Sequence, residues 1–376
     1  MRSNFDTVQR MKTRNLQTTF LGILTIVALL TVFHLLKDML IPLVIAGMLA
    51  LMLTPLVNSL KKIRVPRFLA IILVMAALFV VLYIVGQLLY TSLITFTQVF
   101  DTYQSRFDQI LKGIWTRYSI PFEYFPEMGW TRELIDRIVQ VTASFVSFGS
   151  TFGLVLLFLV FMLAESALSL RKFHNAFPRG LSNTIGWAVA DIAKQLRRYL
   201  TIKTLISALT GVLVWAALTI IGQDLAILWG LLAFLLNYIP SLGSVFIMAA
   251  TMLLGLVQFY PMWNQIIAVW ITMPVIQIIL GVILDPQLQS DHLDLSPLVI
   301  LISLAFWGWI WGIVGMFLAV PLTVSMKIVM NHINGLRPIS IMMGSGKMSR
   351  SFRRAWYRNR VKKKSGNLEE ENPPQD

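Results

Sequence analysis

Eight long apolar segments limit this chain to one broad class of fold. They comprise residues 16–35, 40–57, 67–91, 143–164, 204–222, 225–257, 265–284 and 297–326. About 20 consecutive apolar residues cross the hydrocarbon core of a bilayer as a helix. Only 13% of the residues are charged, roughly half the share in a soluble domain. We therefore expect an all-α integral membrane protein with about eight transmembrane helices. The sixth and eighth segments exceed the length of one crossing, so one or two helices should be broken or re-entrant.

The basic residues predict which side of the membrane each connection occupies. Lys and Arg concentrate in the N-terminal arm, in the turn 61–67, in the segment 171–203 and in the tail that follows residue 327. An even number of crossings puts all four on one side, as the positive-inside rule requires of the cytoplasmic side. We expect both termini to be cytoplasmic.

The same pattern divides the chain into segments. The segment 92–142 is predicted to form a small extracytoplasmic helical hairpin, acting as a cap, as a subunit contact or only as a long connection. In the segment 181–203 one face is apolar, while Lys194, Arg197 and Arg198 face water. The predicted order is a cytoplasmic basic arm (1–15), three spans (16–91), the hairpin (92–142), the fourth span (143–164), a cytoplasmic amphipathic segment (165–203), spans five to eight with the transport path (204–326), and a basic, partly disordered cytoplasmic tail (327–376).

The sequence contains no recognisable catalytic chemistry. The chain has no cysteine and no motif for a metalloprotease, a serine hydrolase, a Walker nucleotide site or a dinucleotide fold. Its four histidines are scattered along the chain, so we expect no metal site and no cofactor. We attribute the basic tail to membrane lipids rather than to a nucleic-acid partner.

The stretch NYIPSLGSVF places five helix-breaking or polar residues inside the sixth apolar segment. Broken backbone at membrane depth is tolerated only against protein or a water-filled cavity, and broken helices line substrate paths in secondary transporters. We interpret the stretch as a break or a re-entrant hairpin that lines a polar path. The alternative is a proline kink sealed by its neighbours. The residues are Asn237, Pro240, Ser241, Gly243 and Ser244.

Two further features are candidates for function. Gln277 is polar within the seventh segment, and Asp285 closes that segment against Pro286. Ionisable residues at membrane depth are frequently functional, although Asp285 is equally well explained as an interfacial residue at a helix end. The last apolar segment carries the helix-packing or hinge candidates Gly308, Gly312, Gly315 and Pro321.

These segments resemble one known family. NYIPSLGSVF together with the later stretch ILDPQLQS…LDLSPLVILISLAFWGWIWGIVGMFLAVPL is similar to the two hallmark regions of the autoinducer-2 exporter-like family of bacterial permeases. The resemblance implies a multi-pass protein of the bacterial inner membrane, with about eight spans and both ends cytoplasmic. It also implies homo-oligomers and efflux of small molecules, either autoinducer-2 or, in other members, sodium or lithium in exchange for protons.

The resemblance also assigns positions. It matches the proline–glycine break to Pro240 and Gly243, the acid–proline pair to Asp285 and Pro286, and the end of the last span to Gly312, Gly315 and Pro321. Two departures concern the acid–proline region. The family often has Glu at the position of Asp285, and a Gly-Lys-like pair where Ser290 and Asp291 stand here.

We therefore expect a secondary transporter or permease that exports a small solute or signalling molecule, either coupled to protons or driven by the solute gradient. Asp285 is the candidate coupling carboxylate. A monovalent cation/proton antiporter is the alternative within the same class. A non-transporting membrane scaffold is the alternative outside it. The expected partners are the small-molecule or ion substrate, membrane lipids and further copies of the chain.

Overall fold

The architecture was analysed in a computed structural model, which describes residues 20–22, 24–25, 27–118, 152–165, 179–289, 294–333 and 335–345. All regular structure within these ranges is helical, with no β-strand. Six of the described helices are long and apolar enough to cross a membrane, and three more are apolar but shorter. The predicted all-α membrane fold is confirmed.

The first half of the chain forms a group of helices packed around small residues. The helix Phe20–Leu35 precedes α2 (Lys37–Lys62), which is followed by α3 (Arg67–Tyr118). The short helix Phe152–Glu165 packs on both α2 and α3, where Ala46 and Ala70 are fully buried against Leu159. Arg67 donates a hydrogen bond of 2.7 Å to the carbonyl of Leu163 and thereby ties this helix to the start of α3.

Two predicted segment boundaries do not interrupt the backbone. The span 67–91 and the first part of the hairpin 92–142 form one continuous helix, α3, which has 52 residues and is about 78 Å long. The amphipathic segment 181–203 likewise continues into the fifth span as α6 (Arg179–Ile221). The sequence changes between uniformly apolar and amphipathic character at both places, but no proline stands there to break the helix. The rest of the predicted hairpin and residues 143–151 of the predicted fourth span lie outside the described residues.

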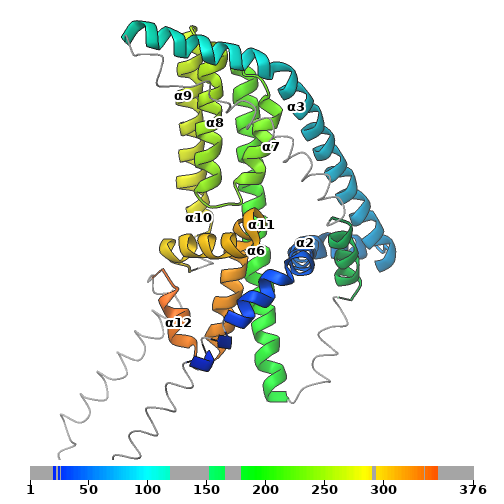
Figure 1. The fold of residues 1–376 in the computed structure, drawn as a ribbon. Helices are drawn as coiled ribbons and strands as arrows, with labels where there is room; N and C mark the ends of the chain where they lie inside the picture. Colours follow the sequence, from blue (N-terminus) through cyan, green and yellow to red (C-terminus); the bar gives the residue numbers. More distant parts are fainter. Residues whose placement is uncertain are drawn as a thin grey trace, which may run out of the picture.

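A second group of helices follows α6. The chain reverses at Gly222, which has a φ of +84°, and descends along α6 as α7 (Ala226–Leu236). It then reverses again into α8 (Leu242–Phe259), and α9 (Trp263–Gln277) packs on α8. Figure 1 shows α7, α8 and α9 side by side below the far half of α3.

The predicted break in the sixth segment is confirmed. Helix α7 has 11 residues and is about 16 Å long, which is too short to cross a hydrocarbon core of about 30 Å. Residues 237–241 form the turn, in which Ser241 has a φ of +63°. A Cβ on Gly243 would lie 1.8 Å from the carbonyl oxygen of Leu236. The segment is therefore a re-entrant helical hairpin closed by glycine, not a kinked span.

The seventh segment does not end where the sequence predicted. After α9 the helix widens into a π-helix, η2 (Ile278–Leu284), and continues as α10 (Asp285–Gln289). The prediction that Asp285 closes the span against Pro286 is wrong. Proline is tolerated in the first turn of a helix, where its missing N–H has no partner to lose, so Pro286 does not interrupt the chain.

The eighth segment is a second hairpin rather than one long span. Helix α11 (Pro297–His332) bends sharply at Gly312, whose φ of 63° and ψ of −145° are not helical. Ser303 donates a hydrogen bond of 3.0 Å to the carbonyl of Ala319; residues this far apart in one straight helix would be separated by about 24 Å. The eighth segment is therefore broken, one of the outcomes predicted from its length, and it does not cross as one straight helix.

The base of this second hairpin is held by the short helix α12 (Arg337–Met342). The backbone N–H of Ser296 donates to the carbonyl of Met343. Asp294 accepts from Lys327 on α11 and from both the backbone N–H and the hydroxyl of Ser345. Figure 1 shows α12 at the opposite end of the molecule from the far half of α3. The two hairpins therefore enter from opposite ends.

Candidate functional site

The centre of the candidate site is an ion pair between α6 and α10. Lys203 Nζ lies 2.7 Å from Asp285 Oδ2, and the two side chains are 3% and 18% exposed. Moving a charge out of water is costly unless an opposite charge compensates it. Each charge therefore holds the other in place, and the pair has no net charge.

Polar groups of the first hairpin surround the same turn of α6. Asn237 is buried and donates through Nδ2 to the hydroxyl of Ser207, at 3.0 Å. The hydroxyl of Thr204 donates to the carbonyl of Leu200. Its oxygen must therefore accept the 2.6 Å hydrogen bond that it shares with the hydroxyl of Tyr238. The hairpin turn is thus bonded to α6 through side chains and not through its backbone.

On the other side of the first hairpin, the last residue of α9 contributes a third polar position. Gln277 is 7% exposed, and its Oε1 has no hydrogen-bond partner. Gly281, one turn further along, faces Ser244 on α8: a Cβ built on it would lie 3.7 Å from Ser244 Oγ. Asp285 follows four residues later, so these positions extend the polar cluster from the ion pair toward α8.

The two hairpins meet at this cluster. The ring of Tyr238 stacks on that of Phe317, with centroids 6.1 Å apart. Ile239 is buried among apolar residues of α11 that include Trp307 and Trp311. The turn of the first hairpin therefore packs against the arms of the second.

The turn of the second hairpin contacts the first helix of the chain. Trp311 Nε1 donates to the carbonyl of Phe33 at 3.1 Å, and His34 Nδ1 lies 3.1 Å from the carbonyl oxygen of Ile310. Both contacts lie next to Gly312, the residue at which α11 turns.

The residues predicted from sequence divide into three groups. Asn237 and Asp285 bind side chains of α6, Ser244 and Gln277 lie beside Gly281, and Pro240 and Gly243 shape the turn. Ser241 and Pro286 are exposed. Gly308, Gly312 and Gly315 belong to the second hairpin, where a Cβ on Gly315 would lie 1.9 Å from the carbonyl oxygen of Trp307. Pro321 is buried in the second arm of α11.

The sequence analysis missed the residues that α6 contributes. Lys203, Thr204 and Ser207 stand at the boundary between the predicted amphipathic segment and the fifth span, and Tyr238 was read as part of the apolar background. One signal was present. Lys203 is followed by 20 residues without a charge, which places it at the edge of the hydrocarbon core, where a lysine needs a partner.

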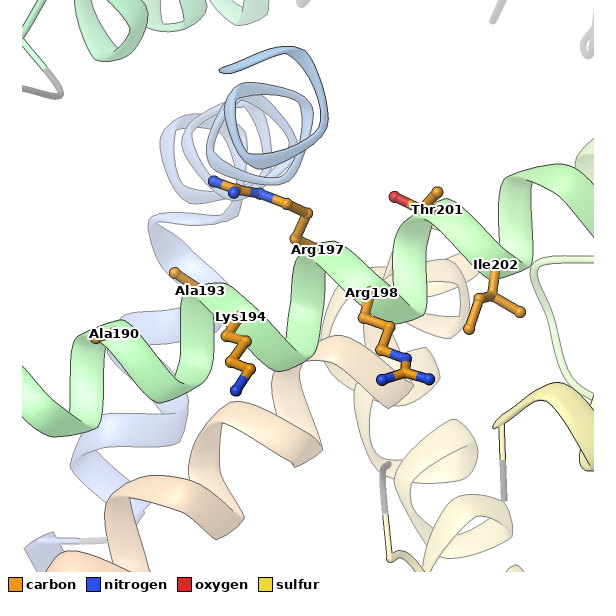
Figure 2. Close-up of a pocket in the computed structure, with 7 residues that line it drawn as sticks. All are labelled: Ala190, Ala193, Lys194, Arg197, Arg198, Thr201 and Ile202. Atoms are coloured by element: carbon orange, nitrogen blue, oxygen red, sulfur yellow. The ribbon is translucent and has the colours of Figure 1, made fainter. Parts of the chain in front are cut away.

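A basic groove lies further down α6. It has a volume of ≈ 650 Å³ and is lined by Ala190, Ala193, Lys194, Arg197, Arg198, Thr201 and Ile202, with no carboxylate among them. Figure 2 shows Lys194 and Arg198 on one side of α6 and Arg197 on the other. Arg197 donates through Nε to the carbonyl of Leu51 on α2. The groove is therefore positively charged, whereas the ion pair at the centre of the candidate site has no net charge.

The described residues contain no group of three or more His, Asp or Glu side chains that could hold a metal ion. The chain matches the model of the AI-2E family transporters over residues 23–335. The chain belongs to the AI-2E transporter family. The match includes both hairpins and all of the polar cluster described above.

Several relatives can be aligned with most of the length of this AI-2E family member. A putative transport protein of Borreliella burgdorferi is 30% identical over 348 residues, which cover 93% of this chain and 96% of the relative. A putative transport protein of Haemophilus influenzae is 30% identical over 88% of this chain and 97% of its own length. The AI-2 transport protein TqsA of Escherichia coli K12 is 30% identical over 81% of this chain and 89% of its own length. The chain is therefore a multi-pass membrane protein of a transport family.

Proposed function

We propose that this protein exports a small neutral solute through the region where the two hairpins meet, with the Lys203–Asp285 pair coupling the movement to protons. It would act as a secondary transporter and not as an enzyme. The observation that carries the proposal is the buried ion pair beside the turn of a re-entrant hairpin. Broken helices supply free backbone groups and polar side chains for solute binding in transporters.

The charges around the pair favour a neutral solute over a sodium or lithium ion. Asp285 is already compensated by the ammonium group of Lys203 at 2.7 Å. A cation at Asp285 would have to displace that ammonium group or share the carboxylate with it. The remaining groups of the cluster are hydroxyls and amides, which suit hydroxyl or carbonyl groups of a solute. The name of the relative TqsA makes autoinducer-2 the first solute to test.

The pair also suggests how protons could enter the cycle. Protonation of Asp285 would cancel its charge and release Lys203 from the contact that joins α6 to α10. An uncompensated buried charge is unstable, so the helices would rearrange until the pair re-forms. The bound proton and the solute would then cross in opposite directions.

We infer the orientation of the protein in the membrane from the basic groove. Lys194, Arg197 and Arg198 lie on the first half of α6, which points toward the end of the molecule that carries α12 (Figure 1), and basic residues favour the cytoplasmic side. We place that end, and both termini, in the cytoplasm of a bacterium whose inner membrane holds the protein. Homo-oligomers, as the family resemblance implies, belong to the same proposal.

The test is a flux assay in everted membrane vesicles. Vesicles with the wild-type chain should accumulate autoinducer-2 when respiration acidifies their interior, and Asp285→Asn should remove most of the accumulation without lowering the amount of inserted protein. Asp294→Asn is the matched control, because Asp294 lies in a second lysine pair outside the cluster.

Two results would contradict the proposal. A pH change in the vesicles that depends on added sodium or lithium would support the cation/proton antiporter instead. If no tested solute or ion moves and Asp285→Asn has no effect, a non-transporting scaffold would be supported.

A further inference from the structure

Gln277 has a buried side-chain oxygen whose role the fold alone does not explain. Its side chain is 7% exposed, yet Oε1 has no hydrogen-bond partner among the described residues. A buried acceptor without a donor destabilises the folded state, and such groups need a specific explanation. The other polar side chains on the α6 side of the cluster are paired, as described above for Lys203, Asn237 and Tyr238.

Gly281 leaves space beside this acceptor. A Cβ built on Gly281 would meet only two atoms within 4 Å outside its own helix backbone, Ser244 Oγ at 3.7 Å and Gln277 Oε1 at 4.0 Å. Gly243 and Gly315 are different, because a Cβ on either would lie within 2 Å of a carbonyl oxygen. Close packing of backbones therefore requires glycine at those two positions but does not require it at Gly281.

The local backbone gives a second indication of a binding role. Gly281 lies in the middle of the π-helix Ile278–Leu284. Such turns are rare within α-helices and occur frequently at functional sites. Here the π-helix places the gap at Gly281 between Gln277 and the ion-paired Asp285.

We propose that Gln277, Gly281 and Ser244 form a subsite for a hydroxyl group of the transported solute. The hydroxyl would occupy the gap at Gly281, donate its proton to Gln277 Oε1 and accept a hydrogen bond from Ser244 Oγ. This inference rests on the proposed function and narrows the substrate to small solutes that carry at least one hydroxyl group.

The chemistry of the gap favours a hydroxyl over an ion. A metal cation needs several oxygen ligands, and only one carbonyl oxygen and one hydroxyl approach this position. An anion would be repelled by Gln277 Oε1. A hydroxyl is both donor and acceptor, so it satisfies both groups.

Gly281→Ala is the discriminating variant. The added methyl group fills the gap at ordinary contact distances, so the fold should be retained, and the hydroxyl should be excluded. With autoinducer-2 as the probe in everted vesicles, we expect KM to rise about tenfold to a hundredfold, because two hydrogen bonds are lost, with the maximal rate and the amount of inserted protein unchanged. Gly86→Ala, at an α3 glycine with no atom within 4 Å, is the control and should leave KM unchanged.

A measurement without solute tests the subsite independently of transport. Gln277→Leu removes the unpartnered acceptor and keeps a similar volume, so the purified, solute-free chain should unfold at a higher temperature. A lower unfolding temperature would mean that the gap holds a structural water, and would overturn the proposal.

The outcomes separate the two proposals. An unchanged KM in Gly281→Ala, while Asp285→Asn still abolishes flux, overturns the subsite and leaves the transporter intact. If wild-type vesicles move no autoinducer-2, that cargo assignment fails, and the unfolding temperature of Gln277→Leu then decides whether the subsite stands.

Discussion

Lys203 on α6 and Asp285 on α10 are 82 residues apart in sequence and share a hydrogen bond of 2.7 Å. Both side chains are withdrawn from solvent, more completely for the lysine than for the aspartate. The contact connects the long helix α6 to the end of the π-helix, and the first hairpin turn lies beside it. Changes at either residue should therefore affect the whole cluster.

Removing one partner of this ion pair should destabilise the fold more than removing both. We expect Lys203→Met to lower the free energy of unfolding by about 3–5 kcal/mol, because Asp285 would keep an uncompensated charge. The double variant Lys203→Met/Asp285→Leu should recover most of that loss. Chemical unfolding of the chain in detergent measures both. The interpretation fails if the double variant is no more stable than Lys203→Met. The pair of Lys327 and Asp294 is the control, because its aspartate is 54% exposed, and Asp294→Asn should cost about 0–1 kcal/mol.

The turn of the first hairpin should not tolerate a methyl group. In Gly243→Ala the new Cβ would lie 1.8 Å from the carbonyl oxygen of Leu236, so the two arms must separate. We expect a loss of about 3 kcal/mol or more together with loss of flux. Thermal unfolding and the vesicle assay would show this. Gly86→Ala should instead stabilise α3 by about 0.5–1 kcal/mol. Equal effects of the two substitutions would contradict the packing argument.

Tyr103 should contribute to holding the far half of α3 on the hairpin. Tyr103 is buried, and its hydroxyl donates to Asp224 Oδ2 at 2.5 Å, while the backbone N–H of Asp224 donates to Gln258. Tyr103→Phe should leave that carboxylate with fewer donors and increase hydrogen exchange where α7 begins and α8 ends. Tyr90→Phe alters an exposed residue of the same helix and should have no such effect. Unchanged exchange in Tyr103→Phe would mean that other contacts hold α3, including the hydrogen bond that Arg106 donates to the carbonyl of Gln258.

Acid should release α12 from the base of the second hairpin. Partial burial raises the pKa of Asp294, but hydrogen bonds from Ser345 and Lys327 outweigh it, so the pKa lies below its ordinary value of 3.8. A carboxyl group with a lowered pKa stabilises the fold above its unfolded pKa, and this contribution is lost as the pH falls through the folded value. Hydrogen exchange in α12, corrected for the intrinsic effect of pH, should therefore rise below about pH 3.8. Asp294→Asn should abolish the dependence; if exchange in that variant still rises with acid, another group is responsible.

The sequence predicted the class of fold and the first hairpin, because both depend on local features. Long apolar runs specify membrane helices, and five polar or helix-breaking residues within one run specify a break. A break in the eighth segment was predicted from its length, and Gly312 was named as a hinge candidate. The full reversal could not be predicted, because the neighbours of Gly312 are fully apolar and give no sign of a turn. The length of α3 was missed because a change from apolar to amphipathic character alters what surrounds a helix and leaves its backbone continuous.

Half of the polar cluster could be predicted for the same reason. Asn237, Gln277 and Asp285 stand out against apolar neighbours, so the sequence identifies them singly. Their partners could not be predicted, because Lys203 and Ser207 lie in another helix and only the fold brings them together. Tyr238 gave no signal, since its ring packs as an apolar residue does and only its hydroxyl is polar.

The contact between the first helix and the second hairpin affects how the chain is made. Trp311 Nε1 donates to the carbonyl of Phe33 from a position 278 residues later in the sequence. At roughly 5–20 residues per second, a ribosome takes on the order of tens of seconds to synthesise that interval. During this time the first helix must remain in the bilayer with lipid on the face that the hairpin will later cover. The nascent chain therefore remains partly assembled during this time, and a chain truncated before residue 311 could not form this contact.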